Sequence, residues 1–371
     1  NTTIDKHGVN MRFVDRLIIK VIAISLLSSG VVASSLPDYY SEPGISGNRA
    51  YETGMPAESV DALSGGLLLH HTDLVVPGNA GMDIVVQRNY RAPAGQPGIL
   101  GSDYLQGKTV LGEGWDIHFG RVWHGNLFSA PGRGCGTNQA NTGSNPVLEL
   151  PDGSRKELLD APTSESYGYI TKDLWIGICE SDYLVVVSPD GRRYKFDYYQ
   201  LYGTEYAWHV TQIEDTFGNR LTIDYYNNVS QALIKEISST DGRSVTFHYE
   251  NLSSYNALLT EVRLNGNWRV RYDHKLLSGY TDHYYLEDAE RRDEGGKWLY
   301  KYYETRPSNN QFGLHALREV TAPTGLKTQY NYEGVNFTPG IVSATFTTVL
   351  ASKSVSGADV NSGTWSYDYS P

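Results

Sequence analysis

A short pattern recurs along the second half of this chain and constrains its fold more than any other feature. Gly191 is followed by Tyr194, Phe196 and Tyr198, which stand three, five and seven residues beyond the glycine. Successive side chains of a strand point to opposite faces, so this spacing places all three on one face. The same spacing links three further pairs: Gly218 with Tyr225, Gly242 with Tyr249, and Gly325 with Tyr332. The pattern predicts strands that begin at a glycine turn and end in tyrosine.

Three more units are one residue shorter and carry tryptophan two residues after the glycine. They join Gly266 to Tyr272, Gly296 to Tyr302, and Gly363 to Tyr369. A one-residue slip would exchange the two faces of a strand, so the retained alternation predicts that the turn absorbs the change. In every unit we expect the glycine to take the strained position of the connection.

Apolar stretches directly before the turns supply the other half of each hairpin. Examples are residues 207–213, 232–237, 257–262 and 316–320. The units recur at intervals of 24 to 38 residues, which is typical of a repeat array with loop insertions. A composition of 38 glycines and 28 tyrosines agrees with many turns and many half-buried strands. The sequence therefore predicts an all-β protein, in which residues 161–371 form one repeat region.

The residues before the repeats divide into three parts. Residues 56–160 contain alternating stretches such as 83–90, joined by glycine-rich turns, and predict a β-rich N-terminal domain. Residues 34–55 are rich in Pro, Gly and Ser and predict a linker. Basic residues before an apolar run over 21–32 predict a secretory signal peptide in residues 1–33, cleaved near Ala33, with an extension before Met11. A buried helix is the alternative for this run, which is too short for a transmembrane anchor.

The net charge and the cysteine content indicate which partners and which cellular compartment to expect. A net charge of −11 without a basic stripe would repel phosphate backbones, so we expect no nucleic-acid partner. The signal peptide predicts a secreted or cell-surface protein. In that oxidising compartment Cys135 and Cys179 could form one disulfide, and the sequence leaves open whether they do.

Candidate chemistry is sparse. His70 and His71 are adjacent, so on a strand they would point to opposite faces and could not easily share a metal ion. Neither a nucleophile elbow nor a phosphate-binding loop occurs in the sequence. We therefore expect no catalytic, cofactor-binding or metal-binding residues and no enzyme activity. Paired carboxylates of a glycoside hydrolase stay an alternative, as do exposed aromatic rows that stack on glycans.

The repeat resembles the YD repeats of RHS proteins. The likeness is carried by residues 196–199 (Phe-Asp-Tyr-Tyr), 223–226 (Ile-Asp-Tyr-Tyr), 272–273 (Tyr-Asp) and 367–369 (Tyr-Asp-Tyr). Upstream, residues 65–74, 88–90 (Arg-Asn-Tyr) and 112–115 (Gly-Glu-Gly-Trp) are similar to the segment that precedes RHS repeats. The resemblance covers residues 58–371.

The resemblance implies a long antiparallel β-sheet that spirals into a hollow shell. In bacterial toxins such shells enclose a variable C-terminal toxin, and related teneurin shells serve in cell-surface contacts. We therefore expect a structural shell segment from the front of a longer protein, with further repeats or a C-terminal toxin as its partner. An adhesion module that binds surface glycans or proteins is the alternative.

Overall fold

The computed structural model describes residues 57–60, 65–92, 109–124, 145–162, 165, 167–180, 183–202, 205–227, 231–251, 257–278, 283–304, 315–335, 347–358 and 360–369. The chain divides into two compact units, residues 1–49 and 50–371, and every described residue belongs to the second. The predicted signal peptide and linker, residues 1–33 and 34–55, lie outside the described residues and stay predictions.

The described residues form twenty-four β-strands and one short 3-10 turn, η2 (Asn79–Gly81), with no α-helix among them. The expected all-β fold, built on a long antiparallel sheet, is confirmed. No helix in this part of the chain is long and apolar enough to cross a bilayer.

Four strands form a separate N-terminal sheet. Its order is β1 (Ala57–Val60), β2 (Leu67–Val76), β3 (Ile84–Arg91) and β4 (Trp115–Asp116), and each pair is antiparallel. Side chains alternate along β3, where Ile84, Val86, Arg88 and Tyr90 are all buried. Arg88 therefore lies on the buried face of β3, where the other side chains are apolar or aromatic.

The second sheet, here called the repeat sheet, contains about twenty strands. They are β5 (Arg121–His124), β6 (Val147–Glu149), β7 (Arg155–Glu157), β8 (Leu159–Asp160), β9 (Tyr169–Ile170), β10 (Ile176–Cys179), β11 (Leu184–Val187), β12 (Arg193–Tyr202), β13 (Glu205–Glu214), β14 (Arg220–Tyr225), β15 (Ile234–Ser239), β16 (Ser244–Glu250), β17 (Leu258–Leu264), β18 (Asn267–Leu276), β19 (Tyr284–Arg291), β20 (Gly296–Tyr302), β21 (Leu317–Thr321), β22 (Lys327–Val335), β23 (Thr347–Gly357) and β24 (Val360–Ser366). The predicted domain boundary at 160/161 falls within this sheet, but sheet membership does not by itself decide a domain limit, so the boundary stays a prediction.

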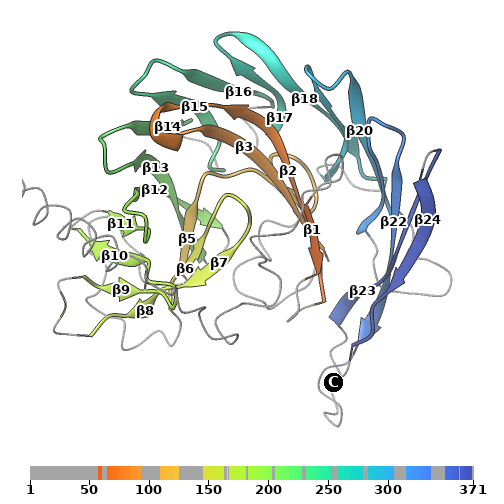
Figure 1. The fold of residues 1–371 in the computed structure, drawn as a ribbon, viewed down its shortest axis with the longest axis horizontal. Helices are drawn as coiled ribbons and strands as arrows, with labels where there is room; N and C mark the ends of the chain where they lie inside the picture. Colours follow the sequence, from red (N-terminus) through yellow and green to blue (C-terminus); the bar gives the residue numbers. More distant parts are fainter. Residues whose placement is uncertain are drawn as a thin grey trace, which may run out of the picture. The chain divides into compact units, whose positions relative to one another are not determined.

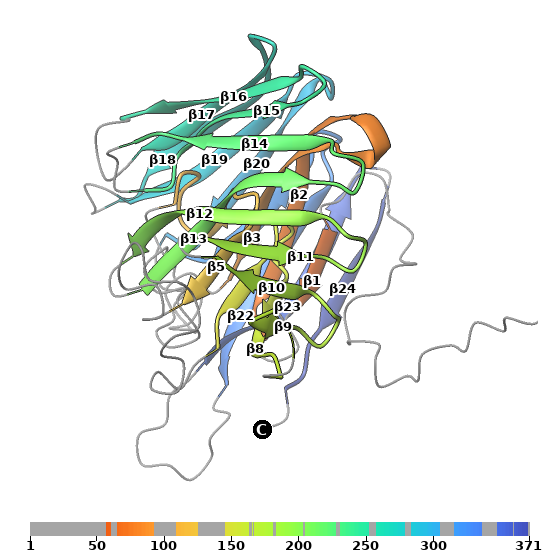
Figure 2. The same cartoon turned by 90° about the vertical axis from the view of Figure 1, so that its left-hand side faces the viewer.

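Strands that follow one another in sequence pair antiparallel from β8 through β24, and Figure 2 shows β8 to β14 running side by side. One pairing joins distant parts of the chain: β5 pairs with β6 on one side and with β13 on the other. β7 continues directly into β8 through Leu158, so β5 to β13 form one unbroken series of strands. The pairing of β13 with β5 closes this series into a ring. From β13 onward the sheet continues as a meander.

The alternation read from the repeats appears directly in the burial of their side chains. Leu221, Ile223 and Tyr225 are buried on β14, and Thr328, Tyr330 and Tyr332 are buried on β22. Five repeat glycines have the positive φ that a tight turn requires: Gly191, Gly218, Gly242, Gly266 and Gly325.

The shorter units depart from the expected turn geometry. Before β20 the positive φ belongs to Gly295, with Gly296 already paired in the strand. Gly363 lies inside β24 opposite Val355, so placing the strained turn position at these two glycines was wrong. In the shorter unit that begins at Gly266, the turn does not absorb the missing residue as predicted. The ladder between β17 and β18 absorbs it, because its register shifts between Val262 and Arg263.

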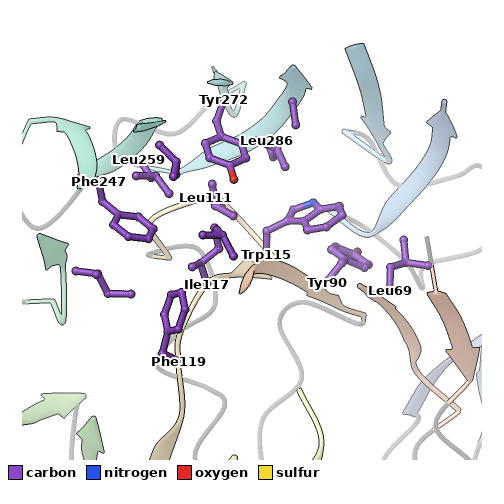
Figure 3. Close-up of a cluster of buried hydrophobic side chains, with 14 of the residues drawn as sticks. Leu69, Tyr90, Leu111, Trp115, Ile117, Phe119, Phe247, Leu259, Tyr272 and Leu286 are labelled. Carbon is purple, nitrogen blue, oxygen red and sulfur yellow. The ribbon is translucent and has the colours of Figure 1, made fainter. Parts of the chain in front are cut away.

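The N-terminal sheet lies inside the curve of β14 to β22, where Figure 1 shows β2 and β3 facing the repeat strands. Figure 3 shows Leu111, Trp115 and Ile117 in one cluster with Phe247 and other side chains of the repeat sheet. All four belong to one hydrophobic core cluster shared by the two sheets. The concave side of the repeat sheet is therefore filled here by the protein's own N-terminal residues.

Candidate functional site

The tyrosines that end the repeats make a recurring hydrogen bond, here called the tyrosine tether. In five repeats the phenol hydroxyl donates to a backbone carbonyl on the preceding strand. The tethers join Tyr225 to Val210 (2.8 Å), Tyr249 to Ile234 (2.9 Å), Tyr302 to Leu286 (2.9 Å), Tyr332 to Leu317 (2.9 Å) and Tyr369 to Leu350 (2.7 Å).

Each acceptor carbonyl lies at a β-bulge between two hairpins. Ile234 pairs with Tyr225 where the register shifts between Asp224 and Tyr225, and Leu317 pairs with Tyr302 at an equivalent shift. A bulge interrupts the ladder, and a buried carbonyl without a partner is costly. The tether from the next repeat therefore satisfies the backbone at the point where the bulge disturbs it. Tyr225, for example, pairs with Ile234, which accepts the tether of Tyr249, and Tyr225 itself donates the preceding tether to Val210. Successive hairpins are therefore linked one to the next.

Burial keeps these phenols in the protonated form that can donate. It raises the pKa of Tyr225, Tyr302 and Tyr332 well above 10, and that of Tyr369 to about 12. Each tether should contribute about 1 kcal/mol to the free energy of unfolding.

Two repeat tyrosines bond differently. Tyr198 stacks on Tyr225 with ring centroids 4.5 Å apart and donates to the carbonyl of Tyr226 at 3.2 Å. The hydroxyl of Tyr272 donates to Oδ2 of Asp73 in the N-terminal sheet at 2.7 Å. The fourth repeat thus fixes the N-terminal sheet to the repeat sheet.

Asp73 belongs to a buried polar cluster, here called the buried anchor. Its carboxylate is paired with the guanidinium of Arg88, and both side chains are almost fully buried. Arg88 Nη2 donates to the hydroxyl of Tyr300 at 2.7 Å, and its guanidinium lies 5.6 Å from the ring of Trp115. Burial raises the pKa of Asp73, while Arg88 opposes that shift. A guanidinium cannot lose its proton in a protein, so the carboxylate is the charge that balances it.

Arginines of the Asp-Gly-Arg turns hold the rim of the N-terminal sheet. Arg243 donates to the carbonyls of Val76 (2.8 Å) and Met82 (2.9 Å), which flank the turn between β2 and β3. The neighbouring Asp241 orients the Arg243 guanidinium with a contact of 2.6 Å. Arg192, from the equivalent turn of an earlier repeat, donates to the carbonyl of Gly81 at 3.3 Å. The arginine after the turn glycine therefore has a packing role that the repeat pattern alone did not reveal.

A small polar pocket of about 30 Å³ lies where β13 meets both β5 and β14. Its polar lining includes Asp116, His118, Arg121, Tyr202, His209 and Gln231. Arg121 contacts Asp116 at 2.6 Å and Glu149 at 2.8 Å. Burial alone would raise the pKa of Glu149, but Arg121 and Arg155 hold it well below its usual range.

Both histidines of this polar pocket are uncharged at neutral pH. Burial, reinforced by Arg121, lowers the pKa of His118 to about 4 and that of His209 well below 6.5. Within the described residues, no cluster of three or more His, Cys, Asp or Glu side chains could hold a metal ion. The two imidazoles are groups of this pocket that can take up a proton in acid.

The adjacent histidines and the two cysteines singled out in the sequence do not form a shared site within the described residues. His70 is half-buried, with Nδ1 3.1 Å from the carbonyl oxygen of Asp152, whereas His71 is buried against the ring of Trp298 with centroids 4.5 Å apart. Cys179 ends β10, but Cys135 lies outside the described residues, so a bridge between them stays a prediction.

Comparisons with known proteins give only distant similarity. No family model and no curated protein matches the chain. Among solved structures, a TcdB2-TccC3-TEV crystal structure is 14% identical and covers 89% of this chain, with a TM-score of 0.34. The Tc holotoxin pore of Photorhabdus luminescens is 13% identical over 84% of this chain, with a TM-score of 0.32. This chain spans 16% of the length of each of those two chains.

The N-terminal domain of the effector protein SpvB from Salmonella typhimurium strain LT2 is 9% identical, covers 80% of this chain and 100% of its own, and has a TM-score of 0.31. These TM-scores are too low to establish a shared fold. Conclusions about function therefore rest on the residues of this chain.

Proposed function

We propose that this chain is a non-catalytic structural segment of a secreted RHS-type protein, contributing to a β-shell that delivers or encloses a toxin. The observation that carries the proposal is the tyrosine tether, which recurs from hairpin to hairpin and serves the backbone of the sheet. A residue that belonged to a ligand site would be expected in one or two units only. The recurring tyrosine thus has an architectural role in a sheet that can be extended repeat by repeat.

The filled concave side gives this segment a particular place in such a shell. The buried anchor and the rim arginines hold the N-terminal sheet against the repeat strands. We infer that this stretch seals one part of the shell, and that a chamber for cargo would be formed by further repeats of the same polypeptide. The partner is then a C-terminal toxin or those further repeats.

The contacts of the half-exposed aromatic residues count against the glycan-binding alternative. Several of their ring faces are covered by cations from neighbouring strands. Lys156 lies 5.6 Å from the ring of Trp175, Lys195 lies 4.5 Å from Tyr183, and Arg292, directly after β19, lies 5.3 Å from Trp268 on β18. A sugar stacks on an open aromatic face, so these rings fit cross-strand packing better than glycan recognition.

Limited proteolysis of the protein expressed from the whole reading frame tests the proposal. We expect any polypeptide downstream of Pro371 to be protected in the native state and to be digested once urea unfolds the shell. Tyr249→Phe combined with Tyr332→Phe should weaken that protection, whereas Tyr284→Phe on β19, outside the tethers, should not. Digestion of the downstream polypeptide at the same rate with and without urea would refute an enclosing role.

A further inference from the structure

Strand β13 has two different neighbours along the same side. Toward its N-terminal end Trp208 and His209 pair with Val122 and Arg121 of β5, and toward its C-terminal end it pairs with β14. Among the residues that the structure describes, four pairs join β5 to β13, and this ladder closes the ring of strands. The polar pocket lies at this fork, here called the β5–β13 junction.

Two buried histidines are built into the junction. His209 is paired with Arg121 in the ladder, and its Nε2 lies 3.3 Å from the hydroxyl of Tyr202. Nδ1 of His118 accepts the backbone N–H of Gly120 at 3.3 Å, and the carbonyl of Gly120 accepts the N–H of Val210 on β13 at 3.0 Å. A proton on Nδ1 of His118 would face the Gly120 N–H, so it would disturb the residue that begins the β5–β13 contact.

The charges around these histidines are already balanced. The titratable and charged groups that face them come from β4, β5, β6, β7, β12 and β14: Asp116, Arg121, Glu149, Arg155, Tyr198, Tyr202 and Tyr225. Two carboxylates face two guanidiniums, and the tyrosines are neutral. A positive charge on either imidazole would therefore be buried beside Arg121 without a free anion, which is strongly unfavourable.

We propose that the β5–β13 junction is an acid-sensitive opening point, at which protonation of His118 and His209 separates β5 from β13 while the rest of the repeat sheet stays paired. Water that enters the opened ladder solvates the imidazolium groups and removes the penalty of burying them. The ring of strands then becomes an open sheet with an accessible interior edge. This response goes beyond the proposed structural function. It would still be expected if that function were disproved, because it depends only on groups within the junction.

Hydrogen–deuterium exchange of the full chain at pH 7 and pH 5, corrected for the intrinsic pH dependence of exchange, tests the proposal. Because the pKa of His118 is about 4 in the folded protein and 6.5 when solvated, His118 alone should raise the opening equilibrium by about 20-fold. Burial also lowers the pKa of His209, so its protonation should raise the equilibrium further. Peptides covering residues 120–124 and 206–210 should lose protection by at least that factor. The ladder between β16 and β17 should change far less.

Variants separate junction opening from general acid instability. His118→Gln combined with His209→Gln should abolish the acid response of the junction peptides. His274→Gln removes a half-buried histidine on β18, away from the junction, and should leave that response intact. Equal loss of protection in the junction and in the β16–β17 ladder of the unsubstituted protein would overturn the proposal, even if the double variant fails to fold. So would an acid response that persists in a folded double variant.

Discussion

The buried anchor between Asp73 and Arg88 allows a sharp test of how the two sheets are held together. Replacing Asp73 by Leu leaves a guanidinium that is 0% exposed without its counter-ion. Breaking a buried ion pair from one side costs about 3–5 kcal/mol, because the remaining charge is uncompensated. Since Arg88 cannot lose its proton, we expect Asp73→Leu to fall in that range.

The second substitution should restore stability. Arg88→Met in the Asp73→Leu background removes the orphaned charge, so the double variant should be more stable than Asp73→Leu alone. It would still lose the partners of two hydroxyls, those of Tyr272 and Tyr300, at about 1–3 kcal/mol each. Adding Tyr272→Phe and Tyr300→Phe should recover most of this remaining loss.

Urea unfolding followed by tryptophan fluorescence and by far-UV circular dichroism measures these free energies where the two transitions coincide. A suitable control is the pair Lys275 and Glu304, whose side chains are 50% and 42% exposed. Its double-mutant cycle should give a coupling below about 1 kcal/mol. If the losses of Asp73→Leu and Arg88→Met simply add in the double variant, the two charges do not stabilise each other and the anchor is misassigned.

Three further predictions concern single residues. Tyr249→Phe keeps the ring but removes a tether, so it should cost about 1 kcal/mol in the free energy of unfolding, while Tyr284→Phe should cost less than half of that. Gly242→Ala, whose added Cβ meets nothing within 4 Å, should cost about 1–2 kcal/mol from its positive φ alone. In Gly112→Ala the Cβ would lie 2.6 Å from the carbonyl oxygen of Tyr284, so the cost should exceed about 3 kcal/mol, and equal losses for the two glycines would contradict the close approach. His274 has a pKa of about 4 when folded and 6.5 when unfolded, so stability is lost as the pH falls below 6.5; at pH 5 His274→Gln should spare about 2 kcal/mol of the acid loss, and an unchanged pH profile would refute this.

Local patterns in the sequence were sufficient to predict the strands of the repeats, their buried faces and most turn glycines. They worked because alternation and turn chemistry depend on neighbouring residues. The precise turn position failed at Gly296, where Gly295 stands directly before it and either could adopt positive φ.

Long-range contacts were not predictable in the same way. The pairing of β5 with β13 and the acceptor carbonyl of each tether join residues that no local pattern relates. One signal in the sequence was not used. Arg88 and Asp73 carry opposite charges, and both occupy positions that the alternation of their neighbouring strands assigns to the buried face. Charged residues in such positions usually need each other, so the pair could have been proposed from the sequence.

The bulges explain why the sheet needs its tyrosines. A β-bulge bends the strand that carries it and increases the local twist, so bulges at corresponding places in successive ladders add curvature in small steps. Register shifts occur at Tyr225, Tyr249, Tyr302 and Tyr332, which end their repeats. Each tether then bonds the carbonyl beside the preceding bulge and fixes the bend. Because the bend and its bond both lie within the paired strands, the loops beyond them can vary in length without changing the curvature, which is why repeats of unequal length can build one continuous sheet.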